Sequence, residues 1–108
     1  MIPGGTVNAD KVRADDASVA LVKAFADAGK PIAAICHGPW ALVEARLLTG
    51  KTLTSFPSLQ TDITNAGGSW VDEEVVHCPE NDWDLVTSRN PGDLEAFNAK
   101  LTEIFAKN

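Results

Sequence analysis

The chain has 108 residues, enough for one small domain, and its hydrophobic content of 44% is normal for a globular protein. Its formal charge of −6 argues against nucleic acid as the main partner, because nucleic-acid-binding domains carry a basic face. No apolar run is long enough to span a bilayer and no signal-peptide pattern is present, so we expect a cytoplasmic protein without membrane contact.

The two cysteines, Cys36 and Cys78, do not make a disulfide framework. Each is adjacent to a histidine, and adjacent pairs lack the spacing of zinc ligands. We therefore expect no metal and no cofactor.

The chain opens with signs of a strand end and a close backbone approach. Ile2-Pro3 is typical of the end of a strand, and Gly4-Gly5 of a loop whose backbone comes near another group. Residues 6–13 are polar and are predicted to form a loop or a short helical turn.

A helix is predicted over residues 17–28, followed by a buried strand over residues 31–35. Asp15 or Asp16 would cap the helix, and Gly29 would end it in a left-handed conformation.

The second half continues the alternation of helices with short strands. The predicted elements are a helix over residues 38–48 closed by Gly50, a strand over 51–55, a helix over 58–66, a hairpin of strands 74–77 and 84–88, and a helix over 92–106. This pattern predicts an α/β domain with a mostly parallel sheet. Ligands of such sheets bind beyond the carboxyl ends of the strands, where Gly4-Gly5 and Cys36 can meet in one crevice.

The centre of the chain resembles a nucleophile elbow, in which a reactive residue lies between a buried strand and a helix. Ala34-x-Cys36-x-Gly38 matches the spacing of small residues around such a nucleophile. Gly38 permits a tight turn, and Pro39 suits the first turn of the following helix. His37 is the adjacent residue and can act as a base for the thiol.

This position also suits the chemistry of a cysteine. The thiolate is the nucleophile, and a helix N-terminus favours it through unpaired N–H groups and the helix dipole. The backbone N–H of His37 would serve as one oxyanion donor. The alternative is that Cys36 is a small buried hydrophobic residue, as many free cysteines are.

The elbow is one of several motifs that together resemble the DJ-1/PfpI family, and most closely its PfpI (intracellular protease I) branch. The others, in chain order, are the Gly-Gly loop, Thr54-Ser55-Phe56-Pro57, Asn65-Ala66-Gly67, Trp70-Val71-Asp72-Glu73-Glu74-Val75-Val76 and Thr87-Ser88-Arg89.

The resemblance implies a flavodoxin-like three-layer sandwich of the class I glutamine amidotransferase-like kind, with residues 1–108 as one partial DJ-1/PfpI-like domain. It implies Cys36 as nucleophile, His37 as its partner, and Gly5 and His37 as backbone oxyanion donors. Asp10, contributed by a neighbouring subunit, would complete the triad, although the family branch has glutamate there. The implied protein is a homo-oligomer that acts on peptides or on glycated or aldehyde-modified substrates, with a role in stress.

The resemblance also implies that the chain is incomplete at its amino-terminal end. The family has strands before the Gly-Gly loop, one of which carries a carboxylate that hydrogen-bonds the cysteine. We therefore expect a free sheet edge, marginal stability and little activity for these residues alone.

Two functional classes remain open: a cysteine hydrolase, and a non-catalytic stress or chaperone-like protein or inactive fragment. A glutamine amidotransferase with His77 as its histidine is a weaker alternative, because Pro79 stands where an acid would follow. We expect Cys78 to be an incidental thiol and Arg89 to form a structural ion pair rather than bind a substrate anion. The tryptophans Trp40, Trp70 and Trp83 are expected to be packing residues.

Overall fold

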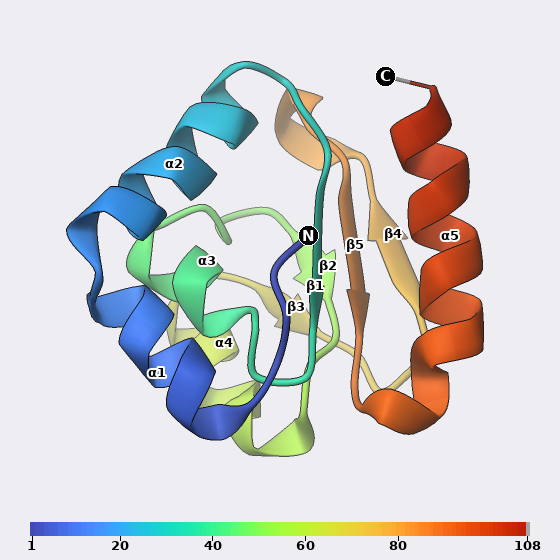
Figure 1. Ribbon diagram of the computed structural model, residues 1–108, viewed down its shortest axis with the longest axis horizontal. Coiled ribbons are helices and arrows are strands. Elements are labelled where there is room, and N and C mark those ends of the chain that lie inside the picture. The colour runs from blue at the N-terminus through green and yellow to red at the C-terminus, as the bar shows by residue number, and fades with distance from the viewer. Residues whose placement is uncertain (108) are drawn as a thin grey trace.

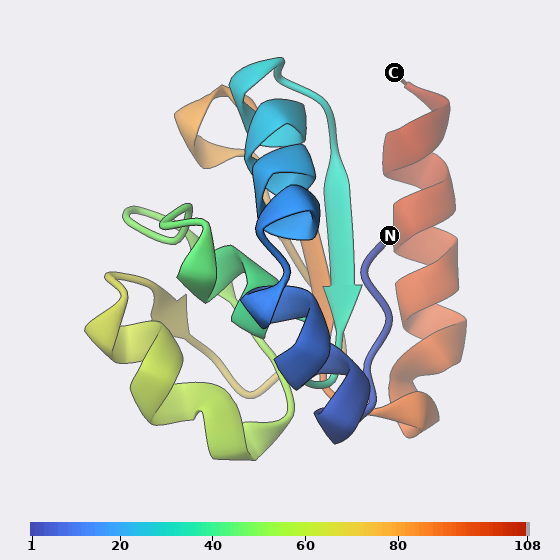
Figure 2. The same ribbon diagram turned by 60° about the vertical axis from the view of Figure 1, so that its left-hand side comes forward.

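The computed structural model describes residues 1–107 and places a central sheet between two layers of helices (Figures 1 and 2). One layer contains α1 (Thr6–Ala14), α2 (Asp16–Asp27), α3 (Trp40–Glu44) and α4 (Gln60–Asn65), and the other contains α5 (Leu94–Ala106). This arrangement confirms the predicted three-layer α/β sandwich.

The main sheet has the strand order β1-β5-β4, formed by β1 (Ile32–Ile35), β5 (Leu85–Ser88) and β4 (Val76–Cys78). β1 and β5 are parallel, whereas β4 and β5 are antiparallel and form the predicted hairpin. A second sheet pairs β2 (Thr52–Leu53) in parallel with β3 (Ser69–Trp70). Ile2 adds a parallel bridge to Ala34 on the other edge of β1, so the pairing is mostly parallel, as predicted.

β1 is buried on both faces, and successive residues contribute to opposite cores. Ile32 and Ala34 belong to the core that also contains Leu42 of α3. Ala33 and Ile35 belong to the core that contains Phe97 of α5. Because both faces are covered, the strand reads as a continuous apolar run rather than an alternating one.

The predicted helix boundaries around α2 and α5 are close to those observed. The Asp15 carboxylate accepts a hydrogen bond from the Ser18 N–H at 3.0 Å and caps α2, and Gly29 adopts φ 72° beyond its end. A short 3-10 turn, Pro91–Asp93, precedes α5, and the Asn90 side chain caps that turn.

Residues 6–13 were expected to form a loop or a short turn, and that prediction is wrong. They form most of α1, which packs against α2 and α3. Ala9 is the only buried residue of this helix, so the helix needs no apolar stripe and gives no periodic signal in the sequence.

The helix expected over residues 38–48 is also shorter than predicted. α3 ends at Glu44, because Arg46 adopts a left-handed backbone with φ 59°, and Leu47 and Leu48 have no regular secondary structure. The expected strand 51–55 is reduced to β2, and the expected helix 58–66 begins with a 3-10 turn, Pro57–Leu59, before α4.

Candidate active site

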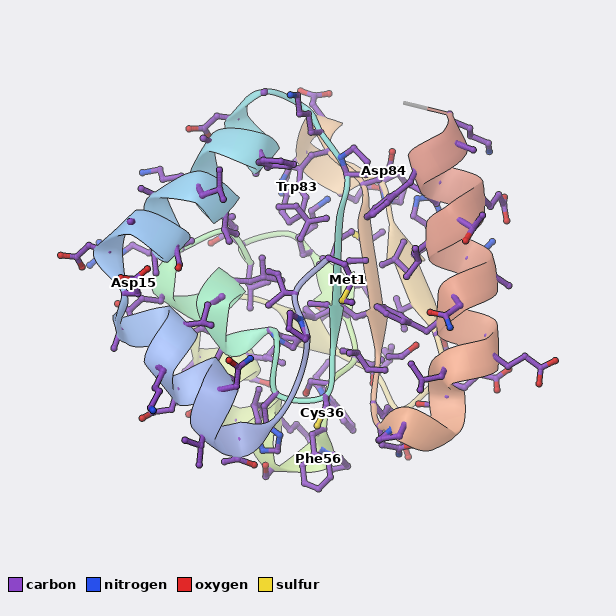
Figure 3. All side chains as sticks on the ribbon, in the orientation of Figure 1. Met1, Asp15, Cys36, Phe56, Trp83 and Asp84 are labelled. Carbon is purple, nitrogen blue, oxygen red and sulfur yellow. The ribbon has the colours of Figure 1, made fainter. Side chains whose placement is uncertain are left out.

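Cys36 lies directly after β1, at the carboxyl end of the strand, and its backbone has φ 61° (Figure 3). This left-handed conformation is costly for a residue with a side chain and is typical of a nucleophile elbow. Gly38 closes the turn with a hydrogen bond from its N–H to the Ile35 carbonyl at 2.9 Å. A Cβ at Gly38 would lie 2.8 Å from the Ile2 carbonyl oxygen, so only glycine fits there. The predicted strand–turn–helix setting is therefore present.

The Gly4-Gly5 loop reaches Cys36, as the sequence predicts. A Cβ at Gly4 would lie 2.7 Å from Cys36 Cβ and 3.4 Å from Cys36 Sγ. Gly5 has φ 87°, a conformation that side chains disfavour. Within residues 1–107, the backbone N–H groups of Gly5 and His37 have no hydrogen-bond acceptor. Both N–H groups are therefore free to donate a hydrogen bond to a ligand.

His37 is placed as a partner for the thiol. Its Nδ1 lies 3.1 Å from Cys36 Sγ, and the side chain is almost fully buried. The imidazole stacks on Phe56 at a centroid distance of 4.8 Å and meets the edge of Trp40 at 5.2 Å. Burial lowers the pKa of His37, because desolvation disfavours the imidazolium. The lowered pKa favours the neutral ring, which can accept a proton.

The second nitrogen of the imidazole faces hydroxyl groups. His37 Nε2 lies 3.5 Å from Thr6 Oγ1 and 3.5 Å from Ser58 Oγ. Phe56 is held beside the elbow by a hydrogen bond from its N–H to the Cys36 carbonyl at 2.9 Å, and Figure 3 shows the two residues together at the carboxyl end of β1. The sequence analysis did not assign Thr6, Phe56 or Ser58 to the site, although Phe56 lies within one of the family motifs.

Asp10 is exposed on α1 and makes no hydrogen bond or ion pair within the described part of the chain. It lies one helical turn beyond Thr6, so it is on the same side of α1 as the residue that approaches His37. No carboxylate of the same chain contacts His37 within residues 1–107.

The other candidate residues have structural partners. Cys78 is buried, and its Sγ accepts a hydrogen bond from the Thr52 N–H at 3.3 Å. His77 Nε2 lies 2.7 Å from Asp84 Oδ1, so it pairs within the hairpin and does not contact Cys36.

The ion pairs of Arg89 agree with its expected structural role. Its Nε donates to Asp93 Oδ2 at 2.9 Å, its Nη2 donates to Asp93 Oδ1 at 3.0 Å, and its Nη1 donates to Asp72 Oδ1 at 2.9 Å. These pairs raise the pKa of Arg89.

The tryptophans pack, as expected. Trp83 is buried, and the indole N–H groups of Trp40 and Trp70 donate to Asp62 and Ser55, each at 3.0 Å. In the described residues there is no cluster of three or more His, Cys, Asp or Glu side chains that could hold a metal ion. Among the same residues, no helix has the length and apolar character needed to cross a membrane.

The fold and the elbow together define a flavodoxin-like α/β domain with a cysteine–histidine pair at the carboxyl end of its sheet. Residues 1–104 match the model of the DJ-1/PfpI family, and the chain belongs to that family.

Curated relatives include General stress protein 18 of Bacillus subtilis, which is 45% identical over 107 residues, covering 99% of this chain and 60% of the relative. Protein/nucleic acid deglycase 2 of Escherichia coli is 42% identical over 104 residues, covering 96% of this chain and 58% of the relative. The chain thus spans less than two thirds of the length of either protein.

Solved structures show the same fold. Drosophila melanogaster DJ-1beta is 33% identical with a TM-score of 0.83, and the match covers 97% of this chain and 54% of that one. A two-domain protein from Anabaena variabilis, with DJ-1/ThiJ/PfpI-like and ferritin-like domains, is 40% identical with a TM-score of 0.81, covering 88% of this chain and 27% of that one.

Proposed function

We propose that these residues carry the active site of a cysteine-dependent hydrolase that acts on proteins, either at peptide bonds or at glycated or aldehyde-modified amines. One observation carries the proposal: Cys36 Sγ lies 3.1 Å from His37 Nδ1 at a left-handed elbow. The family includes proteins named as deglycases, which supports a modified protein amine as the substrate.

For a peptide bond, the geometry supports a two-step acyl transfer. His37 accepts the proton of Cys36, and the thiolate attacks the substrate carbonyl carbon. The carbonyl oxygen gains the negative charge and is stabilised by the N–H groups of Gly5 and His37. Collapse of this intermediate breaks the bond to the leaving amine, which takes the proton from the imidazolium, and leaves a thioester. Water then hydrolyses the thioester and regenerates the thiol.

We propose in addition that Asp10 of a second copy completes this site in a homo-oligomer. Asp10 is exposed and unpaired in its own chain, and it lies one turn from Thr6, which approaches His37 Nε2 at 3.5 Å. A carboxylate facing Nε2 would stabilise the imidazolium that forms when Cys36 is deprotonated.

The test compares Cys36→Ala with Cys78→Ala in a protein that contains these residues. Release of free amine is measured from a glyoxal-modified peptide and, separately, from an unmodified peptide amide. We expect Cys36→Ala to abolish amine release from whichever of the two peptides the unmodified protein cleaves, because the nucleophile is lost. Cys78→Ala should retain most of the activity, because the Cys78 thiol is buried away from the elbow. Equal residual activity in the two variants would contradict the proposal.

The second candidate is a non-catalytic stress or chaperone-like function, which the name of General stress protein 18 favours. It predicts that the protein suppresses aggregation of an unfolding client, measured by light scattering, and that Cys36→Ala suppresses it equally well. If neither peptide releases amine while scattering is suppressed, this second function replaces the first.

A further inference from the structure

A pocket of about 480 Å³ with several polar side chains in its lining lies outside the cysteine site, between α1, the end of α3 and α4. Its polar lining consists of Arg13, Arg46, Thr49, Asp62 and Asn65. The chain has only three arginines and a formal charge of −6, yet two of its arginines line this one pocket. The mechanism proposed above uses none of these residues.

Arg46 is the cation in this pocket that has no partner. Within residues 1–107, its guanidinium makes no hydrogen bond or ion pair. Its backbone adopts φ 59°, which costs free energy for any residue with a side chain, and glycine would remove this cost. The third arginine differs completely, because Arg89 is held by Asp72 and Asp93.

Arg13 is half-buried and only loosely paired. Its Nε lies 3.7 Å from Glu44 Oε1, and its guanidinium lies 5.1 Å from the centre of the Trp40 ring. Asp62 is the one acid that lines the pocket, and its carboxylate already accepts a hydrogen bond from Trp40 Nε1 at 3.0 Å. The carboxylates of Asp62 and Glu44 balance the two guanidinium groups in number, but Glu44 meets Arg13 only at 3.7 Å, so Arg46 is the cation left without a charge partner. Thr49 and Asn65 add neutral hydrogen-bond donors.

Trp40 connects this pocket to the cysteine site. The same indole that contacts Arg13 and Asp62 also meets the His37 ring, at a centroid distance of 5.2 Å. A ligand that reorganises Arg13 or Asp62 would therefore move a side chain that packs on the histidine.

We propose that this pocket binds a small oxyanion, a carboxylate or a phosphate group, between Arg13 and Arg46. Guanidinium groups bind such oxyanions through paired, charge-assisted hydrogen bonds. The anion would replace the long Arg13–Glu44 contact and give Arg46 its missing partner. This site is independent of the catalytic proposal, because binding requires neither Cys36 nor His37.

The test is a titration followed by ¹H–¹⁵N NMR of the arginine Nε–H and tryptophan Nε1–H groups. Inorganic phosphate and succinate are the probes, at ionic strength matched with sodium chloride. We expect the signals of Arg13, Arg46 and Trp40 to move and saturate. Arg89, Trp70 and Trp83 should stay in place and serve as internal controls, because they lie outside the pocket. Tighter binding of phosphate or of succinate identifies the kind of oxyanion that the pocket prefers.

Two variants complete the test, and far-UV circular dichroism verifies their folding. Arg46→Gln should weaken binding about ten-fold or more, because it removes a charge-assisted pair of hydrogen bonds. Lys23→Gln removes the same charge from an exposed position on α2 and should leave the affinity unchanged. Arg13→Lys, which keeps the charge but not the planar fork, should also weaken binding.

The proposal is wrong if the Arg13 and Arg46 signals move no more than that of Arg89, or if the shifts grow without saturation. It is equally wrong if Arg46→Gln binds as tightly as Lys23→Gln. An Arg46→Lys variant repeats the comparison should Arg46→Gln fail to fold.

Discussion

Two aromatic rings bury the imidazole of His37 and favour its neutral form. Phe56 stacks on the imidazole, Trp40 covers its edge, and the resulting burial lowers the pKa of His37. A neutral imidazole can take the Cys36 proton, whereas an imidazolium cannot. The same burial acts on stability: the unfolded chain binds this proton more readily, so stability falls as the pH drops from the ordinary value of 6.5 through the lowered pKa.

For catalysis we expect the acidic limb of kcat/KM, along which activity falls, to begin only below pH 6.5, the ordinary pKa of histidine. Phe56→Ala exposes the ring, raises the pKa of His37 towards its ordinary value and moves this limb to higher pH. A pH–rate profile or an NMR titration of the imidazole C–H measures the shift. Phe25→Ala removes a partly exposed ring that does not contact His37 and should leave the profile unchanged. A limb that stays in place or moves to lower pH in Phe56→Ala would contradict this account.

At the scale of elements, Lys51 joins β2 to the hairpin of β4 and β5. The side chain is fully buried, and its Nζ donates hydrogen bonds to the carbonyl oxygens of Cys78, Glu80 and Trp83. It also lies 4.0 Å from the centre of the Trp83 ring. Burial lowers the pKa of Lys51, but the carbonyl groups around the ammonium compensate for its lost hydration.

Lys51→Met should destabilise the protein strongly, because it leaves buried carbonyl groups without a donor. Each such group costs about 1–3 kcal/mol, so we expect a loss of at least about 3 kcal/mol in the free energy of unfolding. Urea denaturation measures the loss. Lys23→Met on exposed α2 is the matched control and should change stability by less than about 0.5 kcal/mol. A loss below about 1 kcal/mol for Lys51→Met would show that water replaces the ammonium.

Elements with a local chemical signal could be predicted from the sequence, and those set by tertiary packing could not. The elbow was predictable because Gly38 and the apolar strand before Cys36 mark it directly. α1 was not predicted because Ala9 is its only buried residue. The early end of α3 was not predicted because the left-handed residue there is Arg46 and not glycine, which commonly marks a helix end.

Within the site, Cys36 and His37 were predictable because they are adjacent in sequence. Phe56, Thr6 and Ser58 were not assigned, because stacking and hydroxyl contacts with His37 depend on how distant segments fold together. Oxyanion roles for Gly5 and His37, and the role of Asp10, stay predictions.

At the scale of the whole molecule, one side of the domain exposes apolar side chains beside the Ile2 edge of the sheet. Met1, Leu21 and Phe25 are 65%, 60% and 40% exposed, and they line a hollow of about 450 Å³ together with Ile32 and Phe105. Apolar surface of this kind favours association with other chains.

We expect the isolated chain of 108 residues to be marginally stable, with a free energy of unfolding below about 5 kcal/mol, and to bind a hydrophobic dye. Urea unfolding followed by far-UV and near-UV circular dichroism measures the stability. Leu21→Gln should reduce dye binding without lowering stability, because Leu21 is mostly exposed. A soluble monomer that unfolds in one cooperative transition with a larger free energy of unfolding would contradict this expectation.

The shared site proposed for Asp10 predicts that activity requires at least a dimer. Asp10→Ala should lower kcat/KM while leaving the unfolding transition nearly unchanged, since Asp10 is exposed and unpaired in its own chain. Asp16→Ala, an exposed acid on α2, is the matched control. Sedimentation at assay concentrations gives the oligomeric state, and a fully active monomer would rule out the shared site.

The parallel pairing of β1 with β5 has a consequence for the order of folding. Ile32 pairs with Leu85 across about half of the chain, and Cys36 donates its N–H to the Ser88 carbonyl at 3.1 Å. Closing such a long loop is slow, because chain entropy is lost before the contacts form. Phe56 and Gly4 reach Cys36 from other distant segments. The Cys36 thiol therefore receives its surroundings late, and we expect a nascent chain to expose it until β5 has left the ribosome.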